Sequence, residues 1–165
     1  MNWYDETVES YVMKMFFKKA WLMKLLLNIW PPFLFTGIKV VKLTTDFKEA
    51  KIQLTQRSWN TNAVGVHFGG SLYSMTDPFY MLMILSQLGS DYIVWDKSAD
   101  IEYVKPGKGK VYADFVVSQS LIDEIIKQTQ HGDKYLPELP VNIKDEQGEL
   151  VAKLNRTIYI RKKKE

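Results

Sequence analysis

Apolar residues recur with a helical period near the start of the chain, and this spacing predicts a helix over residues 12–30. One narrow arc, at about 100° per residue, holds Val12, Phe16, Met23, Leu27 and Trp30. Lysines lie on the opposite side, but Phe17, Trp21 and Leu25 lie among them. We expect this helix to pack on its own domain, with the displaced apolar residues covered by a second subunit. A basic, aromatic helix lying on a membrane surface is the alternative interpretation.

After Gly37 the period changes to two, which is typical of half-buried strands. The pattern predicts strands over residues 38–45, 50–55, 101–104, 111–117, 141–144 and 150–161. An apolar run over residues 72–88 has helical spacing and predicts a long helix. Ser120 and Asp123 have the spacing of a capping box, which predicts a short helix behind them.

The predicted strands follow one another in pairs rather than alternating singly with helices, so we expect an antiparallel sheet. The long apolar helix must bury itself, and a curved sheet wrapped around it provides the necessary surface. We therefore predict an α+β fold in one domain, residues 1–165, with residues 1–36 as an N-terminal helical extension.

The amino-acid composition excludes or disfavours several kinds of functional site. The 165 residues contain no cysteine, which excludes disulfides, thiolate metal sites, iron–sulfur clusters and a cysteine nucleophile. With only two histidines we expect no metal site, and we expect no cofactor. A net charge of +3 is too small to indicate a nucleic-acid partner.

The positions of charged residues near the start of the chain also bear on where in the cell the protein is expected. The first ten residues include Asp5, Glu6 and Glu9, where a secretory signal would be basic. The most apolar segment, residues 11–34, contains four lysines and is a poor candidate for a membrane-spanning helix. We expect a cytoplasmic protein without a membrane partner.

The candidate chemistry lies around the start of the long helix. Gly69-Gly70 would leave backbone N–H groups free and let a ligand approach the chain closely, which suits a carbonyl oxygen that gains negative charge. Asp77 could act on the same carbonyl as a base or nucleophile. Alternatively, Asp77 followed by Pro78 is a good helix cap without chemistry, and Asn62 could simply hold a turn.

The spacing of these residues resembles a known motif. Asn62-x-x-Gly65, then Gly69-Gly70, then Asp77 is similar to the motif of hotdog-fold acyl-CoA thioesterases of the phenylacetate-pathway type. The chain is most similar to an uncharacterised bacterial domain group within that superfamily, over about residues 37–161. The resemblance implies a hotdog fold, a dimer whose sheets join edge to edge, often a dimer of dimers, and active sites between subunits.

Carried over to this chain, the resemblance implies that Asp77 is the catalytic carboxylate, that Gly70 donates a backbone N–H to the thioester carbonyl, and that Asn62 places substrate or water. The motif has histidine directly before Gly-Gly, whereas this chain has Phe68 there and His67 one position earlier. The residues expected to contact substrate are Gly65, His67, Phe68, Gly69 and Ser71.

We therefore expect a homodimer or homotetramer that hydrolyses acyl-CoA thioesters at a dimer-interface site, with CoA present only as part of the substrate. The shifted His67 and the proline after Asp77 favour a second hypothesis, a non-catalytic protein that binds an acyl chain or acyl-CoA.

Overall fold

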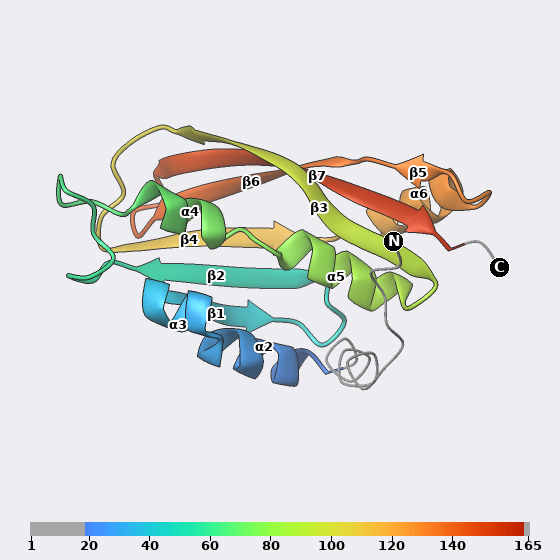
Figure 1. Cartoon of the computed structure of the whole chain (residues 1–165), viewed down its shortest axis with the longest axis horizontal. Coiled ribbons are helices and arrows are strands. Elements are labelled where there is room, and N and C mark those ends of the chain that lie inside the picture. Colours follow the sequence, from blue (N-terminus) through green and yellow to red (C-terminus); the bar gives the residue numbers. More distant parts are fainter. Residues whose placement is uncertain (1–18, 164–165) are drawn as a thin grey trace, which may run out of the picture.

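The computed structural model describes residues 19–163 (Figure 1). Its helices are α2 (Ala20–Ile29), α3 (Pro31–Thr36), α4 (Gly69–Ser74), α5 (Phe79–Leu88) and α6 (Gln119–Thr129). Its strands are β1 (Ile38–Leu43), β2 (Glu49–Thr55), β3 (Tyr92–Tyr103), β4 (Lys110–Val116), β5 (Lys134–Tyr135), β6 (Glu138–Asp145) and β7 (Leu150–Lys162).

The seven strands form one antiparallel sheet in the order β1-β2-β4-β6-β7-β3, with the short β5 paired to β7. The predicted α+β class and antiparallel sheet are confirmed. The third strand is much longer than the predicted segment 101–104, because β3 already begins at Tyr92. Its first half contains Asp96, Lys97 and Ser98 around a register shift, so the alternation that marks a strand is broken there.

The central helix is interrupted, which corrects the expectation of one continuous helix over residues 72–88. Helices α4 and α5 lie across one face of the sheet and are separated by residues 75–78, where the Asp77–Pro78 peptide bond is cis (Figure 1). Proline has no N–H to continue the helical hydrogen bonds. Helix α5 packs into the core through Phe79, whose ring centroid lies 5.2 Å from that of Phe115 on β4.

The N-terminal helices lie along the outer strand β1 (Figure 1). Helix α2 begins at Ala20, and the predicted helical residues 12–18 lie outside the described part of the chain. Met23 is buried as its spacing indicates, whereas Trp21 and Leu25 are exposed. None of the helices in residues 19–163 combines the length and hydrophobicity needed to cross a bilayer.

Helix α6 begins slightly earlier than its predicted capping box. Ser118, not Ser120, is the capping residue, and its Oγ accepts a hydrogen bond from the Leu121 N–H at 3.2 Å. Asp123 instead accepts a bond from the Gln119 side chain at 2.9 Å. The short helix itself is confirmed, because its apolar stripe buries Ile122 and Ile125.

Candidate functional site

The Asp77 carboxylate is held by a buried arginine from the far end of the sequence. Arg156 on β7 is 1% exposed, and its Nη2 lies 3.0 Å from Asp77 Oδ2. The side chain of Asp77 keeps 48% of its surface exposed. Pro78 occupies the cap position of α5, with no side-chain cap bond, so the interpretation of Asp77 as a helix cap is wrong.

Arg156 makes three further contacts that fix its guanidinium. Its Nε donates to Asp96 Oδ1 on β3 at 2.9 Å, and its Nη1 donates to Thr76 Oγ1 at 2.8 Å. The guanidinium also lies over the Tyr73 ring, 5.4 Å from its centroid. Each nitrogen therefore has a partner, which is the condition under which a buried charge is tolerated.

One guanidinium thus serves two carboxyl groups. Burial raises the pKa of Asp96 above its ordinary value, and the charge of Arg156 only partly opposes that rise. Asp77 differs because it is half exposed, and its Oδ1 has no hydrogen-bond partner within residues 19–163. The geometry holds one oxygen of Asp77 in place and leaves the other available.

A cleft of about 230 Å³ opens beside Asp77. Tyr73 and Ser74 of α4 line one side together with Asp77, and the N-terminal helices line the other. Those N-terminal residues are Trp30, Pro32, Phe33 and Thr36. The sequence did not indicate that the helical extension forms a wall of this cleft, because residues 30–36 carry no chemical motif.

The two glycines begin α4 as expected. Within the described residues, the N–H groups of Gly69 and Gly70 have no hydrogen-bond partner, since the first helical bond is made by the Ser71 N–H to the Phe68 carbonyl at 2.9 Å. A Cβ on Gly70 would overlap the Phe68 ring, and one on Gly69 would lie 2.9 Å from Tyr103 Oη. A larger residue at either position would therefore displace an exposed aromatic side chain, Phe68 or Tyr103.

Asn62 and Gly65 shape the loop before α4. Asn62 Oδ1 accepts bonds from the N–H groups of Val64 and Val66, at 3.1 and 3.2 Å, which agrees with the turn-holding role considered for this residue. Gly65 has a φ of +78°, a conformation that favours glycine. The side chain of Asn62 is thus committed to its own loop in the described chain.

His67 is buried and does not line the cleft. It is 2% exposed, its Nε2 donates to the Gly109 carbonyl at 3.1 Å, and its Nδ1 has no partner within the described residues. Burial lowers the pKa of His67 below its ordinary value of 6.5, so the neutral ring is favoured. This environment suits a residue that packs the loop against the 105–109 turn.

The predicted site residues fall into two groups. Asp77 lines the cleft, whereas none of residues 62–71 lines that cleft in the described part of the chain. Ser71 is buried, and Phe68 is 58% exposed over Gly70. No group of three metal-binding side chains is found in residues 19–163.

Arg156 and Asp96 are the site residues that sequence reasoning missed. The alternation of β7 could have indicated Arg156, because Leu154, Arg156 and Ile158 all fall on its buried face. A charged residue at an inward position of a strand is rare without a partner. That partner, Asp77, lies 79 residues earlier, and no local pattern connects the two.

A curved antiparallel sheet around a central helix defines the hotdog fold, and solved structures share it. A Pseudomonas aeruginosa protein of unknown function, described as a probable thioesterase, aligns at a TM-score of 0.75 and 17% identity, over 86% of this chain and 95% of that one. A thioesterase from Haemophilus influenzae aligns at 0.62 and 13% identity, over 87% and 91%. A protein of unknown function from Chlorobaculum tepidum aligns at 0.68 and 14% identity, over 92% and 95%.

The chain belongs to the family described as "Domain of unknown function (DUF4442)", whose family model matches residues 18–160. A comparison with curated proteins gives no match. The family and the structural relatives agree with the predicted resemblance to hotdog thioesterases and to an uncharacterised group among them.

Proposed function

We propose that this protein hydrolyses acyl-CoA thioesters, with Asp77 as the residue that activates water. The observation that carries the proposal is the Asp77 carboxylate at the cleft, anchored through Oδ2 by buried Arg156 while Oδ1 stays free. The hotdog fold and the thioesterase names of two structural relatives support the same class of reaction.

In the proposed reaction, Asp77 Oδ1 accepts a proton from water as the water oxygen attacks the thioester carbonyl carbon. The carbonyl oxygen becomes negatively charged, and the unpaired N–H groups of Gly69 and Gly70 are suited to receive it. The C–S bond then breaks, and the departing thiolate takes the proton back from Asp77, so that a CoA thiol and a carboxylic acid are released and the Asp77 carboxylate is restored. Arg156 is a positioning residue, because it touches Asp77 rather than the reacting atoms.

A single chain does not complete this site. At a helical rise of about 1.5 Å per residue, the segment from Gly69 to Asp77 spans roughly 12 Å, which is too far for both ends to contact one carbonyl group. We therefore propose that the glycines of one subunit meet Asp77 of another. Strand β3 offers the contact, since it is an edge strand of 12 residues at one end of the sheet.

The cleft also suggests where the acyl chain lies. Trp30, Pro32 and Phe33 provide an apolar wall opposite the polar Asp77, and such a combination is typical of ligand sites with one reactive end. In this proposal the helical extension supplies part of the acyl pocket.

The test is turnover of a panel of acyl-CoA substrates by the purified protein. We expect Asp77→Asn to lower kcat by about 100-fold or more, because general base catalysis contributes roughly 10²–10⁴-fold. Asn keeps the size of the side chain and can still accept a bond from Arg156. Asp133→Asn, an exposed aspartate beyond α6, is the matched control and should retain full turnover. Equal rates for the two variants would contradict the proposal.

The Arg156–Asp77 ion pair also favours a second function. The ion pair occupies Asp77 Oδ2, and His67 is buried and does not line the cleft, so a protein with few groups for proton transfer could bind an acyl thioester without cleaving it. Saturable binding of acyl-CoA without release of free thiol would select this alternative. Measurable thiol release that Asp77→Asn abolishes would exclude it.

A further inference from the structure

The N-terminal helices present an apolar surface to solvent. Trp21, Leu25 and Ile29 repeat every four residues along the side of α2 that faces away from β1, and they are 63%, 49% and 56% exposed. On α3, Leu34 and Phe35 are 54% and 70% exposed. We call these five residues the outer face. Large apolar side chains gathered on the exposed side of a folded domain are typical of a binding surface.

Tryptophans border the outer face. Trp59 is 68% exposed, and its Nε1 donates to the Phe35 carbonyl at 3.0 Å, which places its ring beside the end of α3. Trp30, 45% exposed, joins α2 to α3 and also lines the cleft beside Asp77. Tryptophan is enriched where one end of its ring is apolar and the other meets water, as at a bilayer surface.

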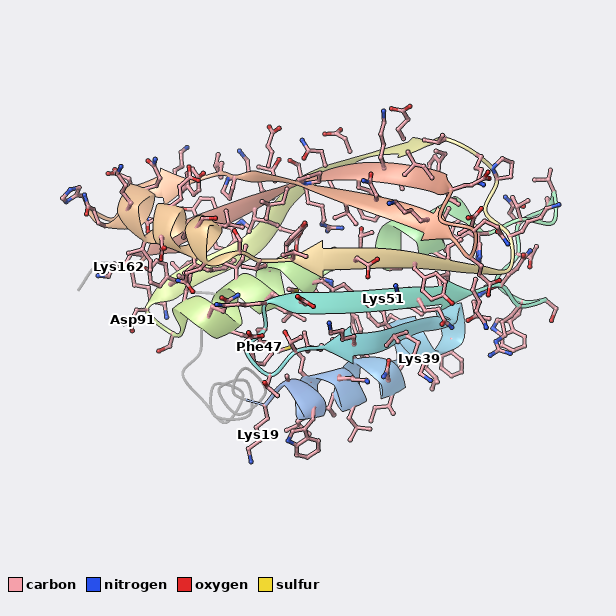
Figure 2. The ribbon with its side chains drawn as sticks, turned by 180° about the vertical axis from the view of Figure 1, so that it is seen from behind. Lys19, Lys39, Phe47, Lys51, Asp91 and Lys162 are labelled. Atoms are coloured by element: carbon pink, nitrogen blue, oxygen red, sulfur yellow. The ribbon has the colours of Figure 1, made fainter. Side chains whose placement is uncertain are left out.

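The described segment that carries the outer face has basic but no acidic residues: residues 19–45 contain four lysines and no aspartate or glutamate. Lys19 and Lys39 are exposed, and Figure 2 shows Lys19 at the start of α2 and Lys39 on the neighbouring strand β1. Lys24 donates to the Val41 carbonyl at 2.7 Å, and Lys42 pairs with Glu49.

We propose that the outer face docks on the surface of a lipid bilayer that contains anionic lipids. The apolar residues would enter the acyl boundary, and the lysines would meet lipid headgroups. A second copy of this chain suits the face less well, because a two-fold contact would bring the same acid-free, lysine-bearing segment against itself.

Docking in this orientation would place the cleft next to the bilayer, because Trp30 belongs to the wall of the cleft and adjoins the outer face. The ligand class indicated is a lipid-soluble long-chain acyl group that reaches the cleft from the membrane. Bilayer docking itself does not depend on the reaction proposed above, so the two can be tested separately.

The experiment is co-flotation of the full chain with vesicles of phosphatidylcholine alone and of phosphatidylcholine with phosphatidylserine. The test variant is Trp21→Glu/Leu25→Glu. The matched control is Ile126→Glu on α6, which changes an aliphatic helix residue that is 45% exposed, close to the 49% of Leu25. Circular dichroism and thermal melting of each variant check that the fold is kept.

We expect the native chain and Ile126→Glu to float with the anionic vesicles, and the double variant to bind them at least about tenfold more weakly. Raising the salt from about 0.05 M to about 0.5 M should also release the protein, since it screens the lysines. Equal flotation of the native chain and the double variant would overturn the proposal. So would a native dimer that the double variant dissociates, without any binding to vesicles.

Discussion

The edge strands β1 and β3 differ in what their backbone groups bind. At β1, helix α2 lies alongside the strand, and the Asn28 side chain bonds both polar groups of Val40: Oδ1 accepts from its N–H at 2.7 Å and Nδ2 donates to its carbonyl at 3.2 Å. Lys24 binds the next carbonyl, that of Val41. At β3, within residues 19–163, no strand or helix pairs with the outer side of the strand.

The contrast shows which side of the sheet is open to a partner. An unpaired edge is a template for another strand, and proteins usually cover or charge such edges. Within residues 19–163, helix α2 covers the β1 edge, whereas no element covers the outer edge of the 12-residue β3. The same strand carries Asp96, which binds Arg156, so the open edge and the candidate site share an element.

The largest effect should come from removing the arginine that ties β3 to the site. Arg156→Met leaves Asp77 and Asp96 without a cation, and breaking a buried ion pair costs about 3–5 kcal/mol. We expect a lower free energy of unfolding in denaturant titrations and loss of thioester turnover. In the triple variant Arg156→Met/Asp77→Asn/Asp96→Asn no carboxylate is left unpaired, so most of the lost free energy of unfolding should be recovered. Thioester turnover should stay absent. Wild-type turnover in either variant would contradict the role of the ion pair.

Prolines in β3 test whether its open edge joins two subunits. Ala99 and Asp100 are consecutive, so their N–H groups point to opposite sides of the strand. Ala99→Pro and Asp100→Pro therefore each remove an N–H on a different side of β3. The variant that loses the N–H facing β7 should have a lower melting temperature. The variant that loses the N–H on the open side of β3 should keep the fold but dimerise about tenfold or more weakly. Light scattering across a dilution series measures this dissociation. A dimer equally stable in both variants would mean that another surface joins the subunits.

At the covered edge, Asn28→Ala removes two hydrogen bonds to Val40. We expect a loss of about 1–2 kcal/mol and a fall in melting temperature of roughly 3–6 °C, with no change in oligomeric state. Asn142→Ala, at an exposed asparagine of β6, is the matched control and should melt close to the native chain. If both variants melt alike, the side chain of Asn28 does not stabilise this edge.

The smallest effect should come from Lys24→Met, which removes one solvent-exposed bond to Val41. The methionine keeps the aliphatic packing, and the free energy of unfolding should change by no more than about 0.5 kcal/mol. Thermal melting measures the difference. A loss as large as that of Asn28→Ala would show that Lys24, rather than Asn28, holds the helix to the edge.

Sequence patterns predicted the parts of the fold that depend on local periodicity. The strand alternation at Ile52 and Leu54 and the apolar stripe of α6 both reappear as buried faces. The break at residues 75–78 was the exception, because the apolar spacing continues across it and only Pro78 indicates an interruption.

The candidate site was predictable only in part, for a physical reason. A motif with short spacing singled out Asp77, which lines the cleft, and the glycines, which do not, and the partner of Asp77 comes from β7 and is set by sheet order. The wall formed by Trp30 and Phe33 likewise depends on how α3 packs, which residue type alone does not determine.

Two carboxyl groups around one guanidinium have a consequence for what leaves the cleft. A thioester is neutral at its reacting carbon, whereas its hydrolysis creates an acid that ionises. Since Arg156 already binds Asp77 and Asp96, that cluster has no unpaired positive charge that could bind the carboxylate product. In the proposed reaction, repulsion from Asp77 should then speed release of the carboxylate product, so that the pocket binds the neutral thioester more tightly than the product.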